Sequence, residues 1–215
     1  KNERKMENDL DLDWPNLKRY EDENKALSLL EHDKRRVVFM GDSITEGWSD
    51  LYASFFSNRS YINRGIGGQT TPQMLIRFKP DVIDLKPFAV VILAGTNDIA
   101  GNTGPSNVKM ITDNIFSMSH IASSYGIKVV LSSILPVYKY EWAKRITDPP
   151  STILDVNKRL KEHAKSNEMG YLDYYSSMVD DRPGLKNEYS PDGVHPNKEG
   201  YEVMSELAEK ALSLL

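Results

Sequence analysis

Residues 37–47 read Val-Val-Phe-Met-Gly-Asp-Ser-Ile-Thr-Glu-Gly, and this stretch decides the fold class of the 215-residue chain. Its four apolar residues form an unbroken run that ends at Gly41, as expected of a strand covered on both faces of a parallel sheet. A polar turn with Ser43 follows at once and leads into a helix. The stretch therefore predicts a strand–turn–helix unit of an α/β protein.

Apolar runs and amphipathic segments alternate along the rest of the chain. Further strands are predicted at 60–63, 89–94, 127–131 and 171–172, and helices at 15–30, 71–85, 106–125, 152–167 and 197–214. Thr70 or Thr71, with Pro72 in the first turn, marks the start of the second helix in that series. Because strands that alternate with helices indicate βαβ units, we expect a mainly parallel sheet of about five strands between layers of helices.

The first 35 residues differ in composition from the rest. They are highly charged and contain few apolar residues before Trp14. We therefore expect a division into an N-terminal helical extension, residues 1–35, packed on the body, and a main domain, residues 36–215. Two roles stay open for the extension, which are covering an edge of the sheet and forming a homodimer.

Composition excludes several classes of protein. The net charge of −4 does not favour nucleic acid or an anionic membrane as a partner. Without cysteine, the chain cannot use disulfides, thiolate catalysis or cysteine-ligated metals. No apolar run reaches the ~18 residues of a membrane-spanning helix. Because the chain begins at Lys1 and not at Met, we favour the periplasm or the outside of the cell over the cytoplasm.

Polar residues follow the predicted strands at one edge of the sheet. In parallel sheets, sites form in the loops at the carboxyl ends of the strands. Those loops carry Ser43, Gly68, Asn97 and the long segment 135–150. Ser43 is expected at the start of a helix, where its amide can face a developing negative charge. The alternative is an ordinary turn in which Ser43 caps the helix.

The sequence Asp192-Gly193-Val194-His195 can supply a carboxylate and a base from one short loop. A serine nucleophile needs a base to take its proton, and the imidazole needs a carboxylate to hold its tautomer. The alternatives are a capping aspartate with a surface histidine, or a pair of metal ligands. A metal site is disfavoured because no histidine cluster supplies the remaining ligands.

Two further motifs contribute polar groups at the same edge. The side-chain amide of Asn97 can donate to an oxyanion, and the Gly65–Gly68 loop lets backbone amides approach a ligand closely. Each motif alone is also explained as a structural turn, and the glycine loop could instead bind phosphate. That loop lacks the lysine of a P-loop, and the dinucleotide fingerprint is absent.

Together, these four motifs resemble the SGNH, or GDSL-type, esterase and lipase family. Residues 41–44 match the block that names the family, with Ile44 where the family motif has leucine. Gly68 matches the glycine of the second block and Asn97 the asparagine of the third. The Asp192–His195 pair matches the Asp-x-x-His of the last block. The order and rough spacing of the blocks agree over most of the chain.

The resemblance implies a flavodoxin-like three-layer α/β/α fold and ester hydrolysis without a cofactor. It also implies that Ser43 is the nucleophile, that His195 is its general base and acid, and that Asp192 orients the imidazole. The oxyanion is implied to be held by the amides of Ser43 and Gly68 and by the side-chain nitrogen of Asn97.

Polar neighbours of these residues have supporting roles in this interpretation. We expect Asp42 and Asp98 to hydrogen-bond nearby backbone groups and not to act in catalysis. The remaining histidines, His32, His120 and His163, are expected to be structural or exposed because they fall on predicted helices or at their ends.

The substrate is less directly encoded. Candidates for substrate contacts on the rim are Arg64, Gln69, Tyr138 and Trp142, with Ile99 and Tyr140 beside them. The aromatic residues could stack on a sugar ring or pin the long loop onto the body. No long apolar lid is present, and the compact block spacing resembles the acetylhydrolase-like branch of the family. We therefore expect a short acyl group, acetyl, on a carbohydrate or other polar alcohol. A lysophospholipase or thioesterase for longer chains and a non-catalytic glycan-binding module are the alternatives.

Overall fold

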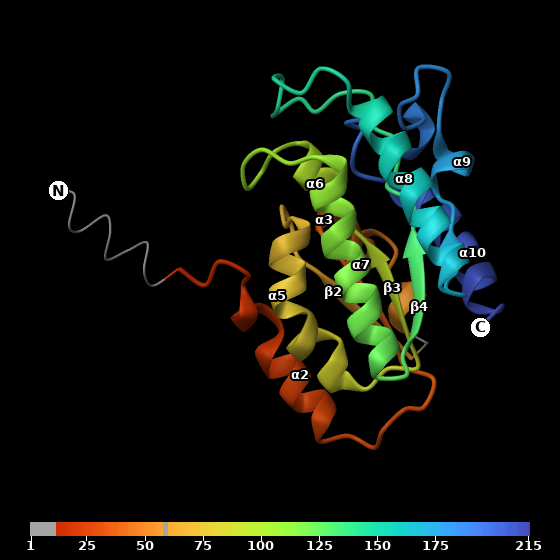
Figure 1. The fold of residues 1–215 in the computed structure, drawn as a ribbon. Helices are drawn as coiled ribbons and strands as arrows, with labels where there is room; N and C mark the ends of the chain where they lie inside the picture. The colour runs from red at the N-terminus through yellow and green to blue at the C-terminus, as the bar shows by residue number, and fades with distance from the viewer. Residues whose placement is uncertain (1–11, 58–59) are drawn as a thin grey trace, which may run out of the picture.

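The computed structural model describes residues 12–57 and 60–215 (Figure 1). These residues form a five-stranded parallel sheet with the strand order β2-β1-β3-β4-β5. The strands are β1 (Val37–Gly41), β2 (Tyr61–Gly65), β3 (Ala89–Leu93), β4 (Lys128–Ser132) and β5 (Gly170–Leu172). This order is that of flavodoxin-like folds. The predicted three-layer α/β/α fold is therefore confirmed.

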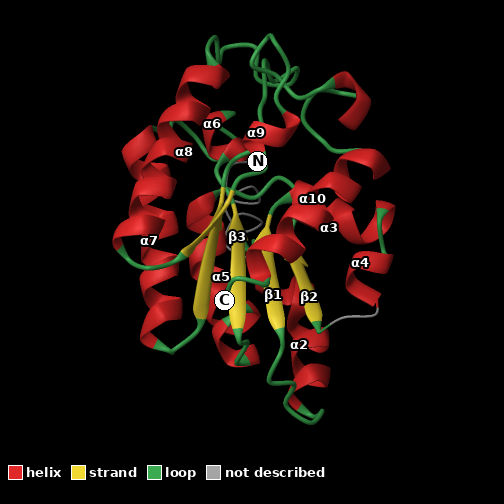
Figure 2. Ribbon diagram, turned by 90° about the vertical axis from the view of Figure 1, so that its right-hand side faces the viewer, coloured by secondary structure: helices red, strands yellow, loops and turns green. Residues whose placement is uncertain are grey.

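Helices cover both faces of this sheet, as Figure 2 shows. One face carries α5 (Thr71–Asp81), α7 (Val108–Ser124) and α8 (Pro149–Ser166), and the other carries α3 (Ser43–Leu51), α4 (Ser54–Ser57), α9 (Tyr175–Met178) and α10 (Lys198–Leu212). The short helix α6 (Thr96–Ile99) follows β3, and the 3₁₀ turn η3 (Asn187–Tyr189) precedes α10. In the described part of the chain, no helix has both the length and the apolar composition needed to cross a bilayer.

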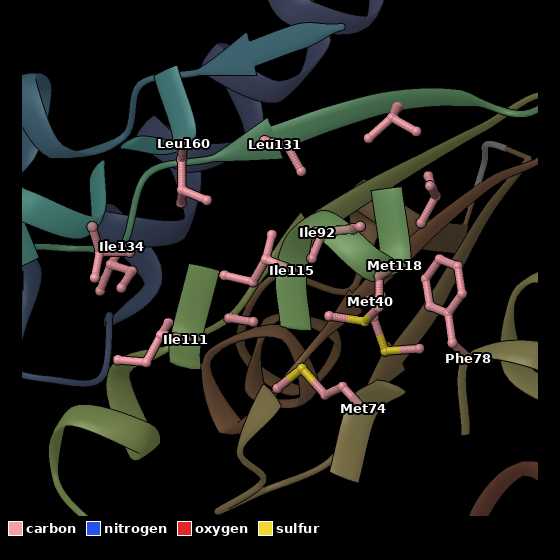
Figure 3. Packing of buried hydrophobic residues seen from close by; sticks show 14 of the residues in the cluster. Met40, Met74, Phe78, Ile92, Ile111, Ile115, Met118, Leu131, Ile134 and Leu160 are labelled. Carbon is pink, nitrogen blue, oxygen red and sulfur yellow. The ribbon is translucent and has the colours of Figure 1, made fainter. Parts of the chain in front are cut away.

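The alternation of side chains along the strands explains the two-sided core. Successive residues of a strand point to opposite faces. Met40 and Ile92 accordingly join the cluster under α5, α7 and α8, whereas Phe39 and Val91 join the cluster under α3 and α10. Figure 3 shows the first cluster, in which Met74 of α5 lies beside Met40. Both faces of the central strands β1 and β3 are buried, so these two strands are apolar without interruption.

Local sequence accounts for where α5 begins and ends. The Thr70 amide donates to Gln73 Oε1 at 3.0 Å, which forms a capping box, and Pro72 occupies the first turn. The helix was predicted to continue to residue 85, but it ends at Asp81. Pro80, in the last turn, supplies no amide hydrogen, and the chain continues as the 3₁₀ turn η2 (Ile83–Leu85).

The described part of the N-terminal extension consists of the 3₁₀ turn η1 (Leu17–Tyr20) and α2 (Glu21–Ser28), where one helix over 15–30 was predicted. Asn16 has φ 55° and ψ 53°, a left-handed conformation that a right-handed helix cannot include. Both elements lie against α5 (Figure 1). Residues 1–11 of the expected extension lie outside the described residues.

Candidate active site

The loops after β1 and β3 meet at the carboxyl edge of the sheet. The chain goes from β1 to β2 on one side and then returns past β1 to β3 on the other. Ligand sites of open α/β sheets form at such a reversal of strand order. Ser43 is the first residue of α3, directly after β1, and Asn97 lies in α6, directly after β3. The topology therefore brings these two residues to one crevice.

Ser43, His195 and Asp192 form a hydrogen-bonded chain at this edge. Ser43 Oγ lies 3.1 Å from His195 Nε2, and His195 Nδ1 lies 2.7 Å from Asp192 Oδ2. A carboxylate that accepts from Nδ1–H leaves Nε2 as an acceptor for the hydroxyl hydrogen. This arrangement activates serine hydroxyls in hydrolases of several unrelated folds.

The Asp192 carboxylate is held by its own loop. Its Oδ1 accepts hydrogen bonds from the amides of Val194 at 2.9 Å and His195 at 2.8 Å. Gly193, with φ 78°, makes the tight turn that points these amides at the carboxylate. Partial burial opposes ionisation, but the hydrogen bonds from the amide and ring of His195 outweigh it and lower the pKa of Asp192 to about 2. The carboxylate is therefore ionised at neutral pH.

Three hydrogen-bond donors lie on neighbouring elements of the site. The amide of Ser43 is at the start of α3, where helix amides have no intrahelical acceptor. Gly68 has φ 76°, which favours glycine, and its amide makes no hydrogen bond within the described residues. Asn97 is buried, and its Nδ2 donates to the Gln69 carbonyl at 3.0 Å. One amide hydrogen of Asn97 therefore remains for a ligand.

Two buried carboxyl groups flank these donors. Asp42 Oδ1 accepts from the Ile44 amide at 2.9 Å and so caps α3. Asp98 accepts from the amide of Thr71 at 3.0 Å and from its hydroxyl at 2.6 Å, at the start of α5. Burial raises the pKa of Asp42 to about 7 and that of Asp98 to about 6, although these hydrogen bonds oppose the change. Asp42 therefore holds the start of α3, where Ser43 lies, and Asp98 holds the start of α5, which follows the loop of Gly68.

The raised pKa of Asp42 predicts a pH dependence of stability. Below about pH 4 the carboxyl is protonated in both folded and unfolded chains, and between about pH 4 and 7 it is protonated only in the folded chain. The free energy of unfolding should therefore fall by ~1 kcal/mol per pH unit as the pH rises through this window. Asp42→Asn, which cannot ionise, should lose this component. Urea unfolding of both proteins from pH 4.5 to 7.5 measures it, and parallel curves would contradict the assignment.

Two of the four residues expected to contact substrate are engaged elsewhere. Arg64 is 2% exposed, and its guanidinium donates to Asn24 Oδ1. Gln69 is 3% exposed, and its side chain bonds to Arg77 Nε and to the Pro15 carbonyl. Neither side chain is available to a ligand, so the sequence-based assignment of both to substrate binding is corrected.

The other rim candidates divide by exposure. Tyr138 and Trp142 are 52% and 50% exposed, and the Trp142 ring centroid lies 6.4 Å from that of His195. Ile99 and Tyr140 are buried in the core and do not reach the rim. Of the aromatic side chains on the 135–150 loop, Trp142 is therefore the one placed beside the imidazole.

Sequence reasoning missed two polar residues of the site. Ser190 Oγ donates to the His195 carbonyl at 2.7 Å and so supports the loop of the imidazole. The sequence Ser-Pro-Asp-Gly at 190–193 is typical of a turn, so the local sequence did point to Ser190. Asn102 donates to the Gly68 carbonyl at 3.1 Å, and its Oδ1 accepts from Trp142 Nε1 at 3.1 Å. The residues around Asn102 gave no indication of its role, because both of its partners are distant in sequence.

The other three histidines lie toward the opposite edge of the sheet or at its surface. His32 Nε2 lies 2.8 Å from the Lys86 carbonyl. His163, in the last turn of α8, stacks on Phe116 with ring centroids 3.8 Å apart and lies 5.0 Å from the His120 ring. Over 12–57 and 60–215, no three potential metal-ligating side chains come together.

Comparison with known proteins agrees with the geometry at this edge. The family model of GDSL-like lipases and acylhydrolases matches residues 39–203, which include every polar residue of the site described above. The chain belongs to the GDSL-like lipase/acylhydrolase family. The resemblance expected from the four sequence motifs is thus confirmed.

Solved structures of similar proteins extend the GDSL-like match over nearly the whole chain. One is a Bacteroides fragilis protein described as an acylhydrolase, with a TM-score of 0.92 and 46% identity over 95% of this chain and 99% of that one. Another is a GDSL-like lipase from Bacteroides thetaiotaomicron, with a TM-score of 0.89 and 44% identity over 93% and 98%.

A more distant sequence match to this GDSL-like chain is an acetylxylan esterase from Xylanibacter ruminicola. It is 24% identical in an alignment that covers 87% of this chain and 45% of that protein. The chain spans about half the length of the curated relatives it matches.

Proposed function

We propose that this protein is a serine esterase that removes short acyl groups, acetyl in particular, from a carbohydrate or another polar alcohol. The observation that carries the proposal is the hydrogen-bonded chain from Ser43 Oγ through His195 to Asp192, with distances of 3.1 and 2.7 Å. It lies beside three donors suited to an oxyanion, in a chain of the GDSL-like family. No metal or cofactor takes part in the proposed chemistry.

In the acylation half of the reaction, Ser43 Oγ attacks the ester carbonyl carbon. His195 Nε2 takes the hydroxyl proton as the new C–O bond forms, and Asp192 stabilises the resulting imidazolium through Nδ1–H. His195 then gives the proton to the leaving alkoxide as the ester C–O bond breaks. The products of this half are a free alcohol and an acyl group on Ser43.

The charge that develops on the carbonyl oxygen is stabilised by hydrogen bonds from the amides of Ser43 and Gly68 and from Asn97 Nδ2. Donors fixed by folding need little reorganisation when the charge appears, and in a site shielded from water each is worth more than in bulk solvent. The positive end of the α3 dipole adds to this effect because Ser43 opens that helix.

In the deacylation half, water takes the place of the alcohol. The water oxygen attacks the acyl carbon while His195 accepts a proton from the water. The same three donors hold the second oxyanion. Collapse of this intermediate breaks the bond to Ser43 Oγ, which recovers its proton from His195. The carboxylic acid leaves, and the enzyme returns to its starting state.

Trp142 supports a carbohydrate or similar alcohol as the leaving group. His195 must protonate the leaving oxygen, so the alcohol has to lie next to the imidazole, and the Trp142 ring centroid is 6.4 Å from that of His195. The indole is half exposed, and its N–H donates to Asn102 Oδ1 at 3.1 Å, which fixes its orientation. A fixed, exposed indole is a surface on which the apolar face of a sugar can pack.

The acyl preference is supported by one relative and by the sequence. The acetylxylan esterase of Xylanibacter ruminicola bears a name that specifies an acetyl ester of a polysaccharide. The blocks of this chain are closely spaced, and no long apolar segment is available as a lid over a fatty acyl chain. Both observations favour a short acyl group over the long chains of a lysophospholipase or thioesterase.

The proposal is tested with a panel of esters assayed in the presence of a chelator. Among aryl esters from acetate to decanoate, kcat/KM should be highest for acetate, and a maximum beyond hexanoate would replace the acetyl proposal with the long-chain alternative.

Trp142→Ala should raise KM for an acetylated xylooligosaccharide and leave KM for an aryl acetate nearly unchanged, since the aryl ester lacks the sugar. The control is Tyr125→Ala, which removes an exposed aromatic side chain at the end of α7 and should change neither KM.

The non-catalytic alternative gives a different result in the same assays. A glycan-binding module would bind the acetylated oligosaccharide without releasing acetate. Its binding would also not require Ser43, Gly68, Asn97, Asp192 and His195 to be present as a set. Release of acetate that is lost in the Ser43→Ala variant would therefore exclude this alternative.

A further inference from the structure

A segment that precedes the family match contacts the loop that carries Gly68. We call residues 14–24 the N-terminal strap, and the family model begins only at residue 39. The Pro15 carbonyl accepts from Gln69 Nε2 at 2.7 Å, and Tyr20 Oη donates to the Gly65 carbonyl at 2.5 Å. The strap thus holds the Gly65–Thr70 loop from its outer side.

A buried arginine connects this loop to the end of β1. Arg77 is fully buried, and its Nε donates to Gln69 Oε1 at 2.6 Å. Its remaining nitrogens donate to the carbonyls of Gly41 and Arg64, each at 2.9 Å, and to Asp81 Oδ2 at 2.9 Å. Gly41 lies two residues before Ser43, so the same guanidinium joins the loop of Gly68 to the end of the strand that precedes the proposed nucleophile.

The strap closes this network through Asn24. Asn24 Oδ1 accepts from Arg64 Nη2 at 2.8 Å and from its Nε at 3.0 Å. Asn24 Nδ2 donates to Asp81 Oδ1 at 2.7 Å. The guanidinium of Arg64 also lies over the ring of Tyr20, 4.5 Å from its centroid. Because buried polar groups of this kind are costly unless all are paired, the network specifies one geometry for the loop.

Gln69 links the network to the proposed oxyanion donors. It directly follows Gly68 in the chain, and its backbone carbonyl accepts from Asn97 Nδ2 at 3.0 Å. A displacement of Gln69 therefore moves the amide of Gly68 and also changes the orientation of the Asn97 side chain. Its own side chain has one bond to the strap and one to Arg77, so its position is set from both sides.

We propose that Gln69 is a positioning residue through which the N-terminal strap fixes the two oxyanion donors outside α3. The proposal rests on the proposed function, because it assigns the network a role in stabilising the transition state. Stabilisation of a developing charge depends steeply on where the donors lie, and a misplacement of about 1 Å can cost ~10²-fold in rate. A strap that only added stability would not have this effect on the chemical step.

Three variants remove different hydrogen bonds of the network. Gln69→Met is similar in size and loses both side-chain hydrogen bonds. Gln69→Glu keeps an acceptor for Arg77 but cannot donate to the Pro15 carbonyl. Tyr20→Phe loses the bond to the Gly65 carbonyl and keeps its ring over Arg64. The matched control is Arg36→Met, because Arg36 is buried and donates to the Leu85 carbonyl at 2.6 Å, at the opposite end of the sheet.

We expect Gln69→Met and Gln69→Glu to lower kcat for an aryl acetate by about 10- to 100-fold with KM nearly unchanged. Tyr20→Phe should lower kcat by about 3- to 10-fold, and Arg36→Met should leave it unchanged even if it unfolds at a lower urea concentration. If Gln69→Met retains the wild-type kcat, or if every variant including Arg36→Met loses kcat in proportion to stability, the strap is only structural and the proposal is overturned.

A second readout does not depend on turnover. The backbone amide of Gly68 and the side-chain amide of Asn97 can be followed by NMR in the 215-residue protein. We expect both resonances to shift in Gln69→Met and Tyr20→Phe and to stay in place in Arg36→Met. Unshifted resonances would overturn the positioning role. A wild-type protein with no esterase activity, but with these shifts, would instead disprove the proposed function alone.

Discussion

Replacing Ser43 with alanine should lower kcat for aryl acetates by at least ~10⁴-fold, because in the proposed mechanism the serine, the imidazole and the carboxylate act as a unit. The variant keeps the oxyanion donors, so a residual rate above that in water is expected. Fluorophosphonate treatment of the wild-type protein should add one phosphonyl group to the peptide that contains Ser43, and the variant should not be labelled. Mass spectrometry of the digested protein measures this directly.

The chain provides a matched control for this experiment. Ser119 Oγ lies 3.1 Å from His163 Nε2, the same distance as that from Ser43 to His195. Among the residues that the structure describes, none places a carboxylate at the other nitrogen of His163, which faces the side chain of Asn167, and Ser119 is fully buried. Ser119→Ala should therefore keep the wild-type kcat and the label. Wild-type turnover in Ser43→Ala would refute the assignment of the nucleophile.

Replacing Asn97 with alanine should lower kcat by about 10²- to 10³-fold, the usual cost of removing one oxyanion donor. The hydrogen bond to the ligand strengthens as charge moves onto the carbonyl oxygen, so KM should change much less than kcat. Asn97→Asp should be at least as slow, because a carboxylate beside the oxyanion repels it. Steady-state kinetics on aryl acetates separate kcat from KM.

Asn114 gives the corresponding control for Asn97. It is a partly buried asparagine of α7 whose Nδ2 donates to Thr71 Oγ1 at 3.0 Å. Asn114→Ala removes a similar amide from a position that does not face the nucleophile, and it should leave kcat within about twofold. An Asn97→Ala variant that raises KM without lowering kcat would show that this side chain binds the substrate in its ground state and not in the transition state.

The strands of this fold were predictable because the signal for each is local. Residues 37–41 and 89–93 are apolar without interruption, and that pattern alone indicates strands buried on both faces. Helix ends were less predictable. The stop of α5 at Asp81 depends on Pro80 and on how the following turn packs, and the start of η1 at Leu17 depends on the left-handed conformation of Asn16.

The candidate site was predictable where residue type and topology suffice. Ser43 and Asn97 directly follow neighbouring parallel strands, so their proximity follows from the strand order. Asp192 and His195 lie three positions apart in a glycine turn, so their contact is local. The contact between Ser43 and His195 spans 152 positions, and only the motif resemblance suggested it before the structure did.

Exposure was the property that the sequence did not reveal. Arg64 and Gln69 were expected to contact the substrate at the rim, but both side chains are buried. Their partners, Asn24 and Pro15, are 40 and 54 positions away, in a segment that precedes the family match. The role of Asn102 was not predictable for the same reason, since its contact with Trp142 spans 40 positions.

The amino-acid sequence by itself determined the order of strands and helices, the family, and the polar residues that end the central strands. Tertiary structure decided which of those polar side chains remain available to a ligand and which are held by other parts of the protein. The physical reason is that strand and turn formation depends on neighbouring residues. A buried polar group, in contrast, must find a hydrogen-bond partner wherever the fold supplies one, and for Gln69 that partner is the backbone of the N-terminal strap.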